Sequence, residues 1–167
     1  MLVIIDMQNH LLQPDSKYYM PEAKKLVKRI AKRLSQAREK KEYIVHTQDI
    51  PIQYKNREDD YPGLQLIQEL KPLPNERLVK KNYFSIAPEE LLVIKQYLFK
   101  SKKEHKDIEI TGVETDLCVL ANTIEIQSAF PEADFFIDPS LVSSRKRHKE
   151  ALKLLQEFNV NIKNFEF

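Results

Sequence analysis

The feature that most limits the possible folds of this chain is an alternation of short apolar segments with longer amphipathic ones. Residues 2–6 (LVIID) are nearly all apolar and rich in β-branched side chains, which is typical of a strand buried on both faces of a parallel sheet. Residues 21–41 begin with Pro21, which is favoured at the first position of a helix, and then repeat apolar residues at helical spacing. This segment therefore predicts an amphipathic helix.

The same alternation continues along the chain. Further strands are expected at 42–48, 76–81, 107–113, 133–139 and 160–165, and further helices at 87–103, 115–130 and 144–158. Strands that alternate with helices form a parallel sheet covered on both faces. The sequence thus predicts a three-layer αβα fold with a six-stranded, mostly parallel sheet. With 167 residues and no repeat or linker, we expect one domain over residues 1–167.

Composition excludes several classes of protein. The net charge is only +2, and the basic runs KKLVKR (24–29) and SRKRHK (144–149) are interpreted as solvated helix faces rather than nucleic-acid sites. The longest apolar stretches have about five residues, far fewer than the roughly 20 that span a bilayer. A single cysteine cannot form an internal disulfide. MLVIIDMQ has no charged segment before its apolar run and no small-residue cleavage site, so we do not expect secretion. We expect a cytoplasmic protein that binds neither nucleic acid nor membrane.

Polar residues stand where several of the expected strands end. In open parallel sheets, ligands bind beyond the carboxyl ends of the strands. Asp6 ends the first strand, Asp49 follows the second, and Lys80 and Lys81 end the third. Adjacent strand residues point to opposite faces, so at most one of the two lysines faces a site. A turn aspartate is the alternative interpretation of Asp6.

The only cysteine, Cys118, lies in GVETDLCVL (112–120), a few residues past one of only two glycines. We expect it in the first turn of a helix capped by Thr115 or Asp116. The backbone N–H groups and the helix dipole there favour a thiolate and an oxyanion. From the residues alone, a nucleophile and a buried apolar filler remain equally open.

The histidines do not identify a base or a metal site. None of them has an informative spacing, and no HxH, HxxxH or DxH pattern stands beside Asp49. The four are His10, His46, His105 and His148.

Five stretches together resemble the isochorismatase-like cysteine hydrolases, which include nicotinamidases, N-carbamoylsarcosine amidohydrolases and isochorismatases. They are LVIIDMQN, HTQD, PGLQLIQELKPLPNERLVKKNYFSIA, ITGVETDLCVLANT and ADFFIDPSLVSSRKRHKEALKLL. The resemblance implies Cys118 as nucleophile, Asp6 as general acid and base, and a lysine that lowers the pKa of the thiol toward neutrality. Lys81 is preferred over Lys80 because Ser85 follows it at the family's spacing.

The resemblance also implies features around this triad. A cis peptide bond is expected between Val113 and Glu114, with the backbone N–H groups of Glu114 and Cys118 as the oxyanion hole. Residues 50–64 form either a pocket loop or a plain solvated loop. The candidates for the pocket wall are Gln8, Asp49, Tyr54 and Tyr61.

Pro51 marks a departure from the nicotinamidases, which typically carry a zinc-binding histidine two residues after TQD. We therefore expect no metal and no cofactor. The expected activity is hydrolysis of a small amide or carbamoyl compound through a thioester, in a homodimer or homotetramer. The alternatives are a nicotinamidase proper, an isochorismatase-type vinyl ether hydrolase, and a non-catalytic small-molecule binder. Fast alkylation of Cys118 near pH 7 would argue against the binder.

Overall fold

The computed structural model describes residues 1–100 and 107–164, with side chains up to residue 98 before the gap. His105 and the end of the last expected strand lie outside these residues. The strands are β1 (Leu2–Ile5), β2 (Ile44–Asp49), β3 (Arg77–Lys81), β4 (Asp107–Val113), β5 (Asp134–Ile137), β6 (Val142–Ser143) and β7 (Asn161–Ile162). The α-helices are α1 (Ala23–Glu39), α2 (Pro88–Lys100), α3 (Leu120–Ala129) and α4 (His148–Glu157).

The strands form one parallel sheet in the order β3-β2-β1-β4-β5-β7. The expected parallel sheet is thus confirmed, but it has seven strands rather than six. The additional strand is β6, whose Val142 and Ser143 pair with the end of β4. Two residues are too few to produce a periodic sequence signal, which is why this strand was not expected.

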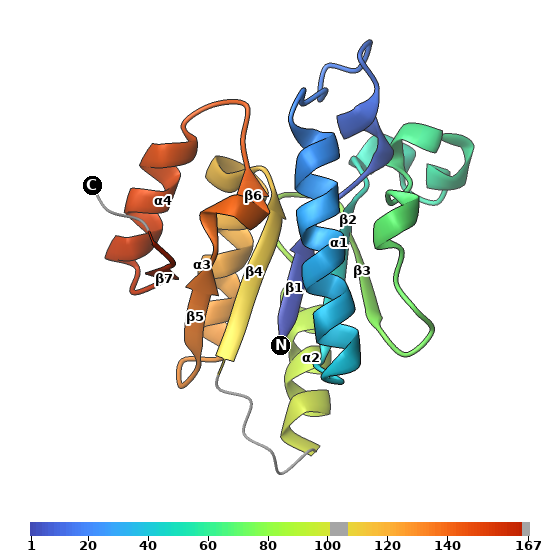
Figure 1. Ribbon diagram of the computed structural model, residues 1–167. Coiled ribbons are helices and arrows are strands. Elements are labelled where there is room, and N and C mark those ends of the chain that lie inside the picture. Colours follow the sequence, from blue (N-terminus) through green and yellow to red (C-terminus); the bar gives the residue numbers. More distant parts are fainter. Residues whose placement is uncertain (101–106, 165–167) are drawn as a thin grey trace.

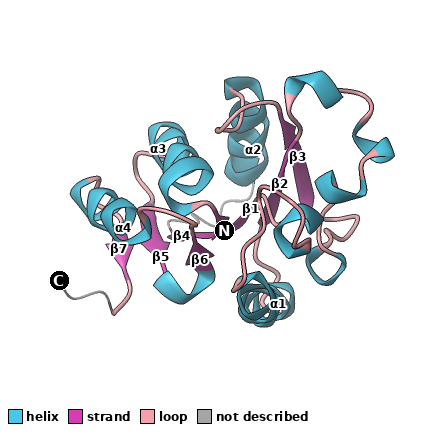
Figure 2. Ribbon diagram, turned by 90° about the horizontal axis from the view of Figure 1, so that it is seen from above, coloured by secondary structure: helices cyan, strands magenta, loops and turns pink. Residues whose placement is uncertain are grey.

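Helices cover both faces of the sheet, as predicted (Figures 1 and 2). On one face α1 packs alone, and on the other lie α2, α3 and α4. The alternating side chains of β1 serve both layers: Leu2 and Ile4 pack in the core under α1, whereas Val3 and Ile5 pack in the core under the other three helices. A strand buried on both faces must be apolar at every position, which explains the unbroken run at the N-terminus.

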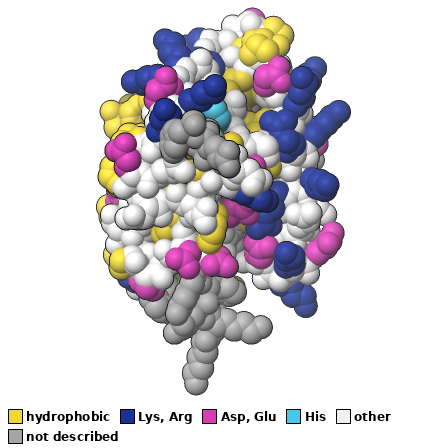
Figure 3. Space-filling model, turned by 60° about the vertical axis from the view of Figure 1, so that its left-hand side comes forward, with side chains coloured by type: hydrophobic (Ala, Val, Ile, Leu, Met, Phe, Trp, Pro, Cys, Tyr) yellow, Lys and Arg dark blue, Asp and Glu magenta, His cyan; other side chains and the backbone are white. Residues whose placement is uncertain are grey.

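The two basic runs have different structures. Residues 24–29 lie in α1, where Lys24, Lys25, Lys28 and Arg29 are exposed, and cationic side chains gather along this side of the surface (Figure 3). The prediction of a solvated helix face is confirmed there. The helix expected from Ser144, however, begins only at His148. The prediction for residues 144–147 is wrong because these residues make long-range contacts in a loop.

The chain order places a crevice between β1 and β4. From β1 the chain builds outward to β2 and β3, then returns to add β4 on the other side of β1. Such a reversal leaves space beyond the carboxyl ends of the two central strands. The strands approach closely here: a Cβ atom on Gly112, whose φ is 108°, would lie 2.1 Å from the carbonyl oxygen of Ile5. Only glycine tolerates both conditions.

Within the described part of the chain, no helix is long and apolar enough to cross a membrane.

Candidate active site

Asp6 follows β1 directly and stands at the crevice. Its backbone has a positive φ of 50°, unusual for a residue other than glycine. Thr47 of β2 holds it on both sides: the Asp6 N–H donates to Thr47 Oγ1 at 3.1 Å, and Thr47 Oγ1 donates to Asp6 Oδ1 at 2.6 Å. Thr47 is a positioning residue that the sequence did not reveal, because a threonine inside a strand is an ordinary β-former.

Lys81 ends β3 and reaches the same point. Its Nζ lies 2.7 Å from Asp6 Oδ2, 3.3 Å from Asp49 Oδ1 and 3.6 Å from Cys118 Sγ. It also donates to the carbonyl oxygen of Tyr83 at 2.9 Å. Lys81 is therefore the charged partner of Asp6 Oδ2, and both side chains are buried. Burial alone would lower the pKa of Lys81, but attraction to Asp6, Cys118 and Asp49 raises it, so the ammonium stays charged.

Lys80 points to the opposite face of the sheet. Its Nζ lies 2.7 Å from Glu58 Oε1, and about half of the Lys80 side chain is exposed. The alternation of side chains along a strand therefore brings Lys81, and not Lys80, to Asp6 and Cys118.

Cys118 lies in a turn of π-helix, Thr115–Val119, that leads from β4 into α3. The expectation of a side-chain cap by Thr115 or Asp116 is wrong: Thr115 Oγ1 lies 2.9 Å from His148 Nδ1, and Asp116 binds Ser144 and Arg147. Single turns of π-helix, which are wider than turns of α-helix, are frequent at functional sites.

Asn122, one turn after the nucleophile candidate, ties the cysteine turn to the loop that follows β3. Its Nδ2 donates to the carbonyl oxygens of Cys118 at 2.7 Å and Phe84 at 2.8 Å, and its Oδ1 accepts from Ile86 N–H at 2.9 Å. Asn122 is completely buried. Like Thr47, it holds the site together without a sequence signal that distinguishes it from other helical residues.

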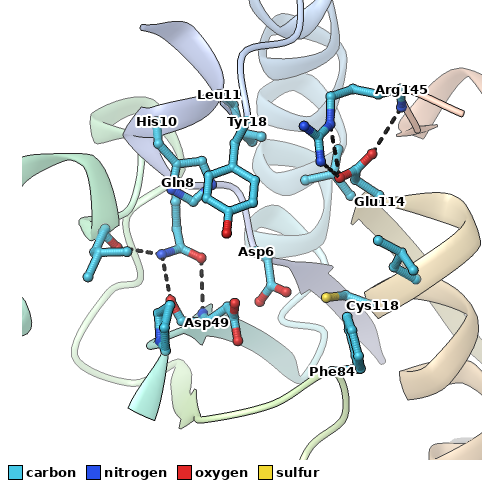
Figure 4. A pocket seen from close by; sticks show the side chains of 14 residues that line it. Asp6, Gln8, His10, Leu11, Tyr18, Asp49, Phe84, Glu114, Cys118 and Arg145 are labelled. Carbon is cyan, nitrogen blue, oxygen red and sulfur yellow. Dashed lines mark hydrogen bonds and ion pairs between the residues drawn. The ribbon is translucent and has the colours of Figure 1, made fainter. Parts of the chain in front are cut away.

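The pKa of Cys118 is raised, mainly by burial and then by the charge of Asp6, and Lys81 only partly offsets these effects. The prediction that Lys81 lowers this pKa toward neutrality is therefore wrong for the resting site. The sequence places both a cation and a carboxylate near the thiol, but it does not reveal that burial and the charge of Asp6 together outweigh Lys81. The thiol is protonated at neutral pH and faces Asp6, which can accept its proton (Figure 4).

Glu114 lies beside the cysteine turn, and the Val113–Glu114 peptide bond is cis, at the position that the resemblance implied. The Glu114 carboxylate binds Arg145, accepting from its backbone N–H at 3.0 Å and from its guanidinium, with 3.1 Å between Oε1 and Nε. The Arg145 guanidinium also lies over the ring of Tyr18 and donates to the carbonyl oxygen of Lys17. The sequence missed Arg145 because SRKRHK was interpreted as helix surface.

A cavity of about 140 Å³ opens above Asp6 and Cys118 (Figure 4). Gln8 and Asp49 line it, as expected. The Gln8 amide is fully used by the backbone, donating to Asp49 O and Leu64 O and accepting from Asp49 N–H. Gln8 thus shapes the wall rather than offering free groups to a ligand.

Tyr54 and Tyr61 do not line this cavity. Their rings pack against each other at 4.3 Å in the neighbouring loop, so their expected place in the wall is wrong. The aromatic residues in the wall are instead Tyr18 and Phe84, together with His10. Neither Tyr18 nor Phe84 belongs to the loop at 50–64, from which the aromatic wall residues were expected.

The donor set around the cavity does not suit a metal ion. Asp49 and His10 line the wall, but Pro51 stands beside Asp49 and offers no ligand atom. Among the residues that the structure describes, no group of three or more His, Cys, Asp or Glu side chains is arranged to hold a metal.

Comparison with known proteins identifies the family. The sequence model of the isochorismatase domain matches residues 1–159. The chain belongs to the isochorismatase family of hydrolases. No curated protein matches it.

Solved structures share the fold at low sequence identity. The pyrazinamidase of Pyrococcus horikoshii in complex with zinc is 17% identical, with a TM-score of 0.78 and 98% of each chain covered. The nicotinamidase from Staphylococcus aureus is 18% identical, with a TM-score of 0.75, covering 98% of this chain and 97% of that one. The N-carbamoylsarcosine amidase from Thermoplasma acidophilum is 17% identical, with a TM-score of 0.71, covering 99% and 98%. The isochorismatase-like fold predicted from the sequence is thereby confirmed.

Proposed function

We propose that this protein is a cysteine-dependent hydrolase of a small amide or carbamoyl compound, with Asp6, Lys81 and Cys118 as its catalytic residues. The observation that carries the proposal is the position of Lys81 Nζ, 2.7 Å from Asp6 Oδ2 and 3.6 Å from Cys118 Sγ, at the edge of a small cavity. A nucleophile, a base and a cation that converge from three separate elements form an arrangement suited to nucleophilic catalysis.

The reaction begins with transfer of the thiol proton. Asp6 accepts the proton of Cys118 as Sγ attacks the carbonyl carbon, so no resting thiolate is needed. The charge moves from Asp6 toward the substrate oxygen, while Lys81 keeps the local charge balanced. The N–H groups of Glu114 and Cys118 donate to the oxyanion, an interaction whose loss typically costs about 10²–10³ in rate.

Collapse of the tetrahedral intermediate completes the first half of the reaction. The C–N bond breaks, Asp6 returns the proton to the leaving nitrogen, and ammonia or an amine departs. In the second half, Asp6 takes a proton from water as the water oxygen attacks the thioester carbon. The C–S bond then breaks, and Cys118 recovers its proton from Asp6. Over the whole cycle one water is consumed, one C–N bond is hydrolysed, and Asp6 and Cys118 return to their starting protonation states.

The amide class is favoured over the alternatives by the cysteine. A vinyl ether hydrolase of this family needs no covalent intermediate, and a binder needs no base beside a thiol. Nicotinamide stays in the substrate panel because solved nicotinamidase and pyrazinamidase structures share the fold. Pro51, where those enzymes typically have a histidine, weighs against nicotinamide itself.

The decisive experiment assays ammonia release from a panel of small amides, including nicotinamide and N-carbamoyl compounds, with and without a chelator. Intact-protein mass spectrometry during turnover should show a substrate-derived mass increase in the native protein and none in Cys118→Ala. Ser128→Ala, a substitution in the same helical segment away from the cavity, is the matched control. Full turnover by Cys118→Ala would overturn the covalent scheme.

Alkylation of the resting protein does not separate an enzyme from a binder, contrary to the expectation from the sequence. Because the pKa of Cys118 is raised by burial and by Asp6, iodoacetamide should react slowly at pH 7 in an active enzyme. The substrate-derived adduct is therefore the discriminating measurement.

A further inference from the structure

The charges around the cavity do not cancel. Asp6, Asp49 and Glu114 line it with negative charge, and the cations paired with these carboxylates are Lys81 and Arg145. Lys17 Nζ lies over the ring of Tyr18, but Lys17 does not line the cavity. Three carboxylates thus face two cations. The pairing of these groups decides which carboxylate is left without a cation.

Arg145 is already paired with a carboxylate of the wall. Its Nε, both terminal nitrogens and backbone N–H all donate to Glu114 or to the carbonyl oxygen of Lys17, and its guanidinium lies 5.4 Å from the centre of the Tyr18 ring. Glu114 in turn uses both oxygens on Arg145. The pair carries no net charge, so the guanidinium forms part of the wall but gives a ligand carboxylate no uncompensated positive charge.

Lys81 is shared between two carboxylates. It lies 2.7 Å from Asp6 and 3.3 Å from Asp49, and the nearer and more buried partner is Asp6. One ammonium compensates one of these charges. The carboxylate left without full compensation is therefore Asp49, whose side chain is 36% exposed, against 7% for Asp6. Burial raises the pKa of the Asp49 carboxyl, so a ligand ammonium beside it would stabilise the charged form.

The remaining titratable group in the wall adds no positive charge. Burial lowers the pKa of His10 to about 4, so the ring is neutral at pH 7. Its ring packs on Tyr18 with 4.8 Å between centroids. The cavity wall consequently offers a ligand one partly exposed carboxylate, and the one arginine in the wall, Arg145, is already paired with Glu114.

We infer that Asp49 is a specificity-determining residue that binds an amino group of the substrate, protonated at neutral pH, and that the site discriminates against amides bearing a carboxylate. This inference rests on the proposed function and narrows its substrate class to small aminoamides. An ammonium would complete the charge balance that Lys81 leaves open. A carboxylate would face Asp49 and Asp6 without a cation to receive it, at a distance where like charges repel strongly. The cavity holds a molecule of roughly the size of benzene.

Three amides of matched length test the inference. They are β-alaninamide, which carries an ammonium group, butyramide, which is neutral, and succinamate, which carries a carboxylate. For the native protein, kcat/KM should rank in that order, with at least about a tenfold difference between the first and the last. In Asp49→Asn this ratio should fall to within about threefold. Asp60→Asn removes the same charge from an exposed position of the nearby loop and should leave the ratio unchanged.

A binding measurement separates this inference from the proposed function. Ligand-observed NMR on Cys118→Ala, which cannot form a thioester, should show β-alaninamide bound more tightly than succinamate, and Asp49→Asn in that background should remove the preference. Turnover without a charge preference, or a preference for succinamate, would overturn the inference and leave the proposed function standing. A preference that survives Asp49→Asn, or equal binding of all three amides, would overturn it as well. Charge-selective binding with no turnover would support the inference and count against the proposed function.

Discussion

Two buried clusters of charge lie at opposite ends of the neighbouring strands β2 and β3. At the carboxyl end, Asp6, Lys81 and Asp49 surround the thiol of Cys118. At the amino end, Glu76 immediately precedes β3 and meets His46 of β2 and Arg38 of α1. The two clusters contain similar residue types on the same scaffold, but their hydrogen bonding differs.

Every group in the Glu76 cluster has a partner. Glu76 Oε1 accepts from Arg38 Nε at 2.7 Å, and Oε2 accepts from Arg38 Nη2 at 3.1 Å and from Leu73 N–H at 3.0 Å, with His46 Nε2 at 2.9 Å. Only 3% of the Glu76 side chain is exposed. This cluster joins α1 to the sheet, and both oxygens of Glu76 are already used by hydrogen bonds within the protein rather than being available to a substrate.

The Asp6 cluster is arranged differently. Lys81 is divided between two carboxylates, the thiol of Cys118 lies beside it, and a cavity lies above them. A buried charge alone does not mark a catalytic site, because both clusters have buried charges. A carboxylate and a shared ammonium next to a thiol and a cavity form the distinguishing combination.

The largest effect is expected from Asp6→Asn. Asparagine has the same shape and can still accept from Thr47, but it cannot take the thiol proton, so kcat should fall by about 10²–10⁴. Steady-state ammonia release, with a melting curve to verify folding, measures this. Asp134→Asn at the exposed start of β5 is the control and should keep the native rate. If Asp6→Asn retains half of the native kcat, the Asp6 cluster is not catalytic, and the contrast with the Glu76 cluster is contradicted.

Glu76→Gln should lower stability but leave kcat almost unchanged. The substitution leaves Arg38 without its carboxylate in a half-buried position, and we expect the free energy of unfolding to fall by about 3 kcal/mol. The value of kcat should stay within about twofold at temperatures where the variant is folded. Urea unfolding and ammonia release measure the two quantities. Glu39→Gln, on the exposed side of α1, should change stability by less than about 0.5 kcal/mol. A large loss of kcat in folded Glu76→Gln would contradict the structural role.

The smallest expected effect is on the pH dependence of the free energy of unfolding, to which the buried His10 in the cavity wall contributes. The pKa of His10 is lowered to about 4 by burial, so below pH 6.5 the unfolded chain binds a proton that the folded site rejects. Stability is therefore lost as the pH falls from about 6.5 to 4, by roughly 2–3 kcal/mol for this group. Urea unfolding at several pH values should show a shallower loss in His10→Gln. The remaining slope should include His46, whose pKa burial also lowers. Identical slopes in the two proteins would contradict the role of His10.

Much of the architecture could be predicted because it depends on local periodicity. The apolar run at residues 2–6, the helical repeat after Pro21 and the alternation along the chain require a parallel sheet between helices. The end of each strand then follows from the same pattern, which placed Asp6 and Cys118 at one edge. The alternation within β3 further limited the lysine candidates to one of two.

The errors concern residues whose environment is made by distant segments. Arg145 was interpreted as part of a helix because its neighbours are helix formers, but its contacts with Glu114 and Lys17 keep it in a loop. Tyr54 and Tyr61 lie in the expected loop, yet they pack on each other outside the cavity. No pattern in the sequence encodes either outcome.

The sequence by itself thus determined the layers, the parallel sheet, the position of Asp6 at a strand end and that of Cys118 in the turn after a strand, because each depends on spacing along the chain. It limited the lysine to Lys80 or Lys81. The tertiary structure alone decided the state of these groups. Burial and the proximity of Asp6 keep the thiol protonated, and the sharing of one ammonium leaves negative charge on Asp49. Charge state depends on desolvation and on distances between segments that are far apart in the sequence, and these exist only once the chain has folded.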